Sequence, residues 1–495
     1  MQWKAVACGL AVLALAAPAS AQETYVQART LSLFNQLVEN GTCEAALPSA
    51  REFWPTREFQ EQLSLDDQQN FLGAVVQCAS FLQDGRAAID AANAAHDVGA
   101  LWADKVRLEL ALAFEDDALA AEAFLDLSRT SAKEFAALES YNAWGALRAA
   151  ERIEGSESTL LRMHEALAAA NYMPREGYHD DYFRLDHARL LAQLGRVEEA
   201  RVRLEGVVDP QAVMTIRINR VYDPLRGDAA FERRLDVAAA AETAIERARR
   251  VQAETPRRIG PTIQLSALLR DIGRSEEALA VVEQLIPAAQ APDAAQHYDD
   301  LDEQLNWLLF AKADLLYDLG RNREARNVFG EAMNAGLVGQ GNITISFAGM
   351  LNAEGRGADA LQVLEVMGRV TSYGDMWMQS ERVCAAEIAG VTAIRDEALT
   401  MMRANEDDNP PALMHALLCV NDIDGAAALM IRRLADPTER ERALVALQPF
   451  HRVATRNMPM EALELERLAQ VRDRPDVRAA VEAVGRIEPT PIFSN

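Results

Sequence analysis

The sequence predicts an all-α protein built from stacked pairs of antiparallel helices. Alanine and leucine are abundant and favour helices, and aromatic residues make up only 6% of the 495 residues. No alternating run of Val, Ile and Thr is long enough to seed a sheet. A helix–Gly-Arg–helix pattern recurs, and Gly320, Gly355, Gly390 and Gly425 follow one another at intervals of 35 residues. The length fits two or three domains or one long array of repeats.

Residues 1–21 have the pattern of a secretory signal peptide. Lys4 supplies the positive charge, a short apolar stretch follows, and the small residues 18–21 form a cleavage site, so the mature chain is expected to begin near Gln22. The apolar stretch is shorter than the roughly 20 residues of a membrane span, and an uncleaved anchor is the alternative. We predict no membrane span in the mature chain. Lysine is rare among the 50 basic residues, which is typical of a GC-rich genome, so a bacterial periplasmic or secreted protein is expected.

Four further segments follow. Residues 22–155 are predicted to form an N-terminal helical segment with degenerate repeats, such as the one around Gly85, and the polar stretch 154–158 ends it. Residues 156–290 and 291–460 are predicted to be helical repeats, the second set with the 35-residue period. Residues 461–495 are predicted to be a helix followed by a mobile, proline-rich tail.

The repeat pattern has a mechanical explanation. It is clearest in LLAQLGRVEEARVRL, LLRDIGRSEEALAVVEQL, LLYDLGRNREARNVFGEA and MLNAEGRGADALQVLEVM, which begin at Leu190, Leu268, Leu315 and Met350. The glycine suits the position just after a helix, where φ is positive. The alanine five residues later suits a close crossing of two helices.

These stretches resemble the tetratricopeptide repeat (TPR) family, whose unit is a helix pair of about 34 residues. The likeness is good over residues 180–370 and weaker up to 440. It implies a right-handed superhelical solenoid in which the first helix of each pair lines a concave groove that binds protein segments. It also implies a scaffold and not an enzyme, with no cofactor and no metal. RNA-reading pentatricopeptide repeats share the period, but a net charge of −25 and a signal peptide argue against nucleic acid as a partner.

The resemblance also implies which residues face the groove. Three aromatics on one face beside two carboxylates would select a partner segment that carries Lys or Arg. The alternative is that Trp307 and Phe310 pack against the insertion at 291–303. The predicted groove residues are Trp307, Phe310, Asp314, Tyr317, Asp318, Arg270, Asp271, Asn342, Ile345, Asn352, Trp377 and Glu387.

The mature chain keeps four cysteines in two pairs, each separated by 35 residues: Cys43 with Cys78 and Cys384 with Cys419. Neither pair has the spacing of a zinc site. Cys43 and Cys78 are expected at helix ends on one edge of the repeats, which predicts a disulfide in an oxidising compartment. Cys384 and Cys419 are expected on stacked helices about 8–10 Å apart, so a second disulfide needs local tilt.

Other candidate chemistry has simpler explanations. His179 and His187 with nearby aspartates suit helix capping and packing better than metal binding. Glu139-Ser140 suits the surface of a solvated helix. The loop that contains Gly336, Gly339 and Gly341 suits a turn between repeats. The acidic run 299–303 suits a solvated insertion. We therefore expect a periplasmic or secreted adaptor, with roles in envelope assembly, secretion or polysaccharide export. The alternatives are an envelope enzyme or the helical part of a cell-wall enzyme complex, and a self-assembling structural protein.

Overall fold

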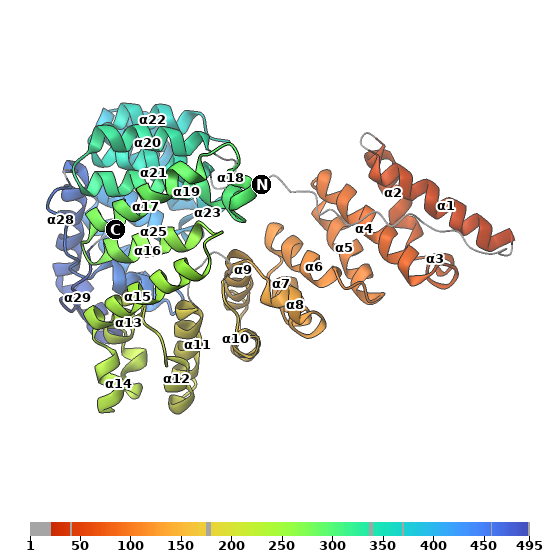
Figure 1. The fold of residues 1–495 in the computed structure, drawn as a ribbon, viewed down its shortest axis with the longest axis horizontal. Helices are drawn as coiled ribbons and strands as arrows, with labels where there is room; N and C mark the ends of the chain where they lie inside the picture. Colours follow the sequence, from red (N-terminus) through yellow and green to blue (C-terminus); the bar gives the residue numbers. More distant parts are fainter. Residues whose placement is uncertain are drawn as a thin grey trace. The chain divides into compact units, whose positions relative to one another are not determined.

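The structure is a computed structural model that describes residues 21–39, 42–174, 180–335, 340–368, 371–456 and 458–493. All but the last residue of the predicted signal peptide lies outside the described residues. Within them the regular elements are helices, accompanied by the isolated β-bridges Asn219–Gly485 and His451–Phe493 (Figure 1). The predicted all-α fold of helix pairs is confirmed. Among the described residues, no helix combines the length and apolar character that crossing a bilayer requires.

The chain divides into two compact units, Met1–Arg175 and Glu176–Asn495. The boundary predicted at residue 155 falls inside unit 1, at the turn between two helices that both pack on α7. The helices of unit 1 are α1 (Ala21–Val38), α2 (Cys43–Phe53), α3 (Arg57–Gln62), α4 (Leu65–Phe81), α5 (Gly85–Asp97), α6 (Ala103–Ala113), α7 (Asp117–Thr130), α8 (Ala132–Ala136), α9 (Ser140–Glu151) and α10 (Glu157–Ala169).

Unit 2 continues the pairing and ends in helices that pack back on the repeats. Its helices are α11 (Asp181–Gln193), α12 (Val197–Arg203), α13 (Pro210–Ile218), η1 (Arg220–Leu225), α14 (Ala229–Arg234), α15 (Val237–Glu254), α16 (Gly260–Asp271), α17 (Ser275–Ala289), α18 (Ala294–His297), α19 (Leu301–Asp318), α20 (Asn322–Asn334), α21 (Gln340–Ala353), α22 (Gly357–Glu365), α23 (Ser372–Ala389), α24 (Thr392–Ala404), η2 (Glu406–Asp408), α25 (Pro410–Cys419), α26 (Ile423–Ala435), α27 (Arg440–Ala446), α28 (Pro459–Asp473) and α29 (Pro475–Val484).

The Gly-Arg dipeptide joins the two helices of each of the four clearest repeats. Gly273, for example, has φ +76°, and the N–H of Arg274 donates to the carbonyl of Leu269 at 2.8 Å. This bond to the preceding helix closes a Schellman turn, which satisfies a carbonyl that the helix leaves without a partner. The arginine side chain then pairs with a carboxylate three residues later, as Arg321 does with Glu324 at 2.7 Å. The repeated motif is therefore Gly-Arg-x-x-Glu/Asp-Ala, in which the acidic residue before the alanine pairs with the arginine.

The alanine five residues after each of these glycines lies where two helices touch. Ala200, Ala278, Ala325 and Ala360 are each 0% exposed. A larger side chain at these positions would push the pair of helices apart, since packed interiors leave no spare volume.

Two glycines of the predicted register do not occupy the turn position. Gly425 lies inside α26, where its N–H donates to the Asp422 side chain that caps the helix. The residue with positive φ is Asn421, at +60°. Gly85 likewise begins α5, and Gln83 takes the positive φ in that turn. Asparagine tolerates the left-handed region, so the turn does not need glycine there.

Candidate partner-binding site

The chain's own C-terminal segment contacts part of the predicted groove of unit 2, at Asp271, Asp314 and Asp318. We call residues 448–456 and 458–493 the arm. The arm contains α28, which packs on α21, α25 and α26, and α29, which packs on α26. Its end lies beside α16 (Figure 1). The proline-rich tail is packed against the rest of unit 2: Thr490 is 5% exposed and Ile492 is 0% exposed.

The arm donates hydrogen bonds to the C-terminal ends of α13, α16, α19 and α25. The N–H of Arg486 donates to Ile218 O of α13 at 2.9 Å, and the N–H of Phe493 donates to Asp271 O of α16 at 2.8 Å. The Thr455 hydroxyl donates to the Asp318 carbonyl at the end of α19. Arg467 donates to the Leu418 and Cys419 carbonyls at the end of α25, each at 2.7 Å.

These contacts have one physical basis. The last carbonyls of a helix have no partner within the helix, and they form the negative end of its dipole. Donors satisfy them, and arginine adds a favourable charge. The arm therefore recognises an edge made of repeat turns.

A buried charge network anchors the arm at the predicted carboxylates. Arg456 Nη1 lies 2.8 Å from Asp318 Oδ1 and 3.3 Å from Asp314 Oδ1. Arg270 of α16 contacts the same two carboxylates, at 2.6 Å for Asp318. Glu461 of the arm completes the network at 2.9 Å from Arg456. Burial alone would lower the pKa of Arg456, but the carboxylates of Asp314, Glu461 and Asp318 raise it above its usual value. Both arginines are therefore charged.

The residues expected to face an open groove are thus mostly buried. Tyr317 and Asp318 are 0% exposed, Asp271 is 6% exposed and Asp314 is 7% exposed. Tyr317 packs against Phe329 with ring centroids 6.0 Å apart, so it belongs to the core of unit 2. Burial is the main reason that the pKa of its hydroxyl is raised well above the usual value.

The remaining predicted residues are spread over several environments. Trp307 and Phe310 form an edge-to-face pair 5.7 Å apart and are partly buried against the core. Asn352 is 4% exposed and donates to Glu381 Oε2 at 2.8 Å. Ile345 is also buried, whereas Asn342 is exposed. The structure therefore brings together Arg270, Asp314 and Asp318 and leaves the others outside that network.

Two more predicted residues lie further along the repeats. The Trp377 ring is 6.3 Å from the His415 ring, and Glu387 is exposed and paired with Arg395 at 2.8 Å. Neither contacts the charge network.

The arm was the feature that sequence reasoning missed. The sequence pointed to a packed arm only through two apolar residues, Ile492 and Phe493, in a tail that was expected to be mobile. The Phe493 ring lies so close to Gly273 that a Cβ there would be 2.6 Å from it.

The four cysteines lie in the expected pairs. Cys43–Cys78 joins α2 to α4 with a Cα–Cα distance of 5.7 Å, and Cys384–Cys419 joins α23 to α25 at 5.3 Å. At this point α23 and α25 lie closer together than stacked helices do on average, which allows the disulfide to form.

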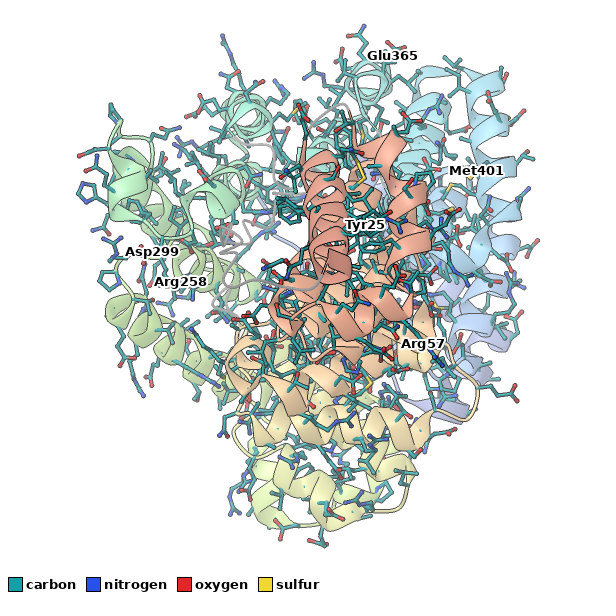
Figure 2. All side chains as sticks on the ribbon, turned by 90° about the vertical axis from the view of Figure 1, so that its right-hand side faces the viewer. Tyr25, Arg57, Arg258, Asp299, Glu365 and Met401 are labelled. Atoms are coloured by element: carbon teal, nitrogen blue, oxygen red, sulfur yellow. A yellow bond between two sulfur atoms is a disulfide. The ribbon has the colours of Figure 1, made fainter. Side chains whose placement is uncertain are left out.

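The acidic insertion has a structural role. Asp300 accepts hydrogen bonds from the N–H groups of Ile259 and Gly260 at 2.8 and 3.1 Å, which holds the start of α16. Asp299 pairs with Arg257 at 2.5 Å and lies next to Arg258 on the surface (Figure 2). His187 is buried at 3% exposure in α11, whereas His179, Gly336 and Gly339 lie outside the described residues.

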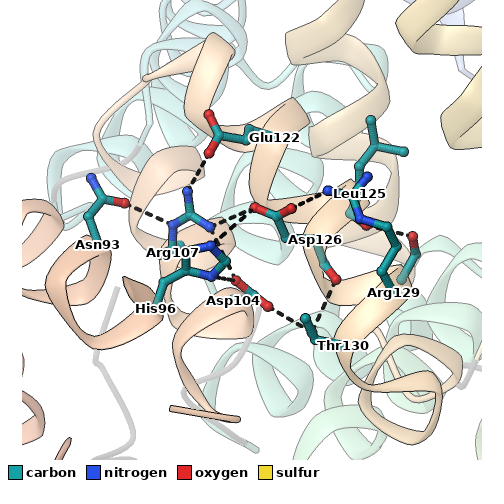
Figure 3. A network of polar contacts seen from close by, with 10 residues as sticks. Asn93, His96, Asp104, Arg107, Glu122, Leu125, Asp126, Arg129 and Thr130 are labelled. Atoms are coloured by element: carbon teal, nitrogen blue, oxygen red, sulfur yellow. Dashed lines mark hydrogen bonds and ion pairs between the residues drawn. The ribbon is translucent and has the colours of Figure 1, made fainter. Parts of the chain in front are cut away.

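A second polar network crosses three helices of unit 1 (Figure 3). Arg107 of α6 lies 3.1 Å from Asp104, 2.8 Å from Asp126 and 2.7 Å from Glu122. His96 Nδ1 lies 2.6 Å from Asp104 Oδ1. His96, Asp104 and Asp126 have the spacing of a metal site. The buried guanidinium of Arg107 already pairs with both aspartates and would repel a cation, so the residues fit an ion-pair network and not a metal.

The repeat turns of unit 1 present a different surface. Phe81 ends α4 and is 72% exposed, and Phe114 follows α6 and is 36% exposed. Both precede a residue of positive φ in a repeat turn, Gln83 and Glu115. These turns correspond to those that the arm covers in unit 2.

No family model matches the chain, and no curated protein matches it. Among solved structures it is similar to that of Naa15/Naa10 bound to HypK-THB, at 15% identity over 81% of this chain and 68% of that one, with a TM-score of 0.20. It is also similar to the crystal structure of yeast Tom70, at 14% identity over 93% of this chain and 99% of that one, with a TM-score of 0.24. These values are too low to carry a conclusion about function.

Proposed function

We propose that this protein is an exported, non-catalytic scaffold whose unit 1 binds an extended segment of a partner protein. One difference between the units carries the proposal. In unit 2 the repeat turns hold the arm, whereas in unit 1 the corresponding turns carry the exposed side chains of Phe81 and Phe114. Large aromatic side chains exposed on neighbouring turns are typical of an interaction surface.

The chemistry of the partner segment follows from the arm. The arm supplies backbone N–H groups, an aromatic ring and arginines to helix ends, and the ends of α4 and α6 have the same negative dipole. Exposed Glu115 adds a carboxylate beside Phe114. The partner segment is therefore extended, with apolar side chains next to Arg or Lys.

Export is the part of the proposal that rests on residues 1–21. Their charged start, apolar stretch and small-residue site are those of a cleaved signal, and the acidic mature chain carries its cysteines in pairs, as suits an oxidising compartment. Intact-mass measurement of the protein isolated from its native cell should give a chain that begins near Gln22. A full-length chain retained in the cytoplasm would contradict export.

Photo-crosslinking tests the surface. A benzoyl-phenylalanine placed at Phe81 in the native cell should give one discrete adduct with another protein. The same residue at Val366, which is 76% exposed on unit 2 away from the arm, is the matched control and should give none. Adding Glu115→Gln and Phe114→Ala should reduce the adduct at position 81. No adduct at Phe81, or equal adducts at both positions, would overturn the proposal, and an adduct between two copies would indicate self-assembly instead.

A further inference from the structure

The two disulfides share a 35-residue separation but have different surroundings. Cys43 and Cys78 are 6% and 2% exposed within an apolar cluster of unit 1. Cys384 is 1% exposed, but Cys419 is half-buried at the end of α25. Because the closed loops have equal length, any difference in how readily the two bonds are reduced comes from their surroundings and not from loop entropy.

A histidine lies against the second disulfide. His415, one helical turn before Cys419, has its Nε2 3.3 Å from Cys384 Sγ and 3.9 Å from Cys419 Sγ. The ring is oriented by carboxylates on two elements: its Nδ1 lies 2.6 Å from Glu464 Oε1 of α28, and its Nε2 lies 3.4 Å from Glu381 Oε1 of α23. Burial lowers the pKa of His415, but Glu464 and Glu381 outweigh burial and raise the pKa well above its usual value. The two carboxylates therefore favour the protonated, imidazolium form of the ring.

Two positive groups contact the two cysteines, one at a sulfur and one at a backbone carbonyl. The His415 imidazolium is 3.3 Å from Cys384 Sγ, and the Arg467 guanidinium is 2.7 Å from the Cys419 carbonyl. The carboxylates of Glu381 and Glu464 contact the imidazolium. A thiolate at Cys384 would be held by a charge-assisted contact, and neighbouring cations lower thiol pKa values in this way.

We propose that Cys384–Cys419 is a redox-exchangeable disulfide that reacts with dithiol reductants, with His415 as the group that stabilises the leaving thiolate. A thiolate of the reductant attacks Sγ of Cys419, the less buried of the two cysteines. A bond forms between the two sulfurs, the Cys384–Cys419 bond breaks, and its electron pair leaves on Cys384 Sγ beside His415. The second thiolate of the reductant then attacks the mixed disulfide and releases the Cys419 thiolate, so the reductant is oxidised to its own disulfide. A lower pKa of the leaving thiol favours the first step.

The test uses the full-length oxidised protein in buffers of reduced and oxidised dithiothreitol. Differential alkylation and peptide mass spectrometry give the midpoint of reduction for each disulfide, with Cys43–Cys78 as the internal control. We expect Cys384–Cys419 to reach its midpoint at a ratio of reduced to oxidised dithiol at least about tenfold lower, which corresponds to about 30 mV. Equal midpoints, or the opposite order, would overturn the proposal.

Two variants separate the role of His415 from a general loss of structure. His415→Gln should move the Cys384–Cys419 midpoint toward that of the control pair, whereas His297→Gln, at an exposed histidine of α18, should leave both unchanged. In Cys419→Ser, the remaining Cys384 thiol should ionise, by its ultraviolet thiolate absorbance, below the usual pKa of about 8.5. A Cys384 thiol of ordinary or raised pKa in that variant, with helicity retained by circular dichroism, contradicts the proposed stabilisation.

Discussion

Arg456 and Asp318 lie 138 residues apart in the sequence and 2.8 Å apart in the structure. This contact places the arm on the repeat turns of unit 2. It also converts a surface that the repeat pattern marks as a groove into a buried interface within one chain.

Removing that arginine should destabilise unit 2. Arg456→Ala leaves Asp314 and Asp318 with Arg270 as their remaining cation, and breaking a buried ion pair costs about 3–5 kcal/mol. Arg452→Ala, at an exposed arginine of the same segment, is the control and should cost less than about 0.5 kcal/mol. Urea denaturation measures both. Equal effects of the two substitutions would show that the network does not hold the arm.

A glycine pair isolates the contribution of Phe493. Gly273→Ala and Gly195→Ala both place a Cβ on a backbone with φ near +75°, but only at Gly273 does it meet the Phe493 ring. Gly195→Ala should cost about 1 kcal/mol from backbone strain, and Gly273→Ala should cost more. The excess should vanish in a Phe493→Ala background. An excess that persists there would mean that Phe493 does not pack on this turn.

The half-buried carboxyl of Glu441 in α27 should make stability pH-dependent. It accepts hydrogen bonds from the Tyr222 hydroxyl at 2.9 Å and from Asn219 Nδ2 at 3.1 Å. Burial is the main cause that raises its pKa to about 7, with Arg189 opposing and Asp186 adding to the rise.

The sign of this dependence follows from proton linkage. Between the unfolded pKa of about 4.3 and about 7, the folded state holds a proton that the unfolded state has lost. The free energy of unfolding should therefore fall as pH rises through this window, by at most about 4 kcal/mol. Glu441→Gln should remove that fall, as thermal denaturation at pH 5 to 8 can show. A fall of the same size in the variant would assign it to another group.

The Arg107 network should stabilise unit 1 on its own. Arg107→Met leaves Asp104 and Asp126 as buried carboxylates without their main cation, which costs about 3–5 kcal/mol. Arg86→Met, at a side chain 83% exposed on α5, should change stability by less than about 1 kcal/mol. Hydrogen exchange should show faster opening of α5 to α7 in Arg107→Met and no change in α19 and α20. Uniform faster exchange in both units would contradict a local role.

Local pattern was enough for the repeats. Gly273 with Arg274 marks a helix end and the start of the next helix, and Ala278 marks the crossing of the two helices. The helix end and the helix crossing each depend on residues that are close in the sequence, so they produce a regular spacing of residue types. The repeat pattern did not identify Asn421 as a turn residue, because the pattern looks for glycine and asparagine can adopt the same left-handed backbone conformation.

The sequence by itself therefore determined the helix pairs, the turns of the four clearest repeats and which cysteines could meet. The tertiary structure decided what covers those turns. Arg270, Asp314 and Asp318 were visible as charges on neighbouring helices, but their pairing with Arg456 depends on a segment more than a hundred residues away. Helical periodicity reflects contacts between residues three and four apart in the sequence. The docking of the arm depends on contacts between distant segments, which produce no repeating pattern in the sequence.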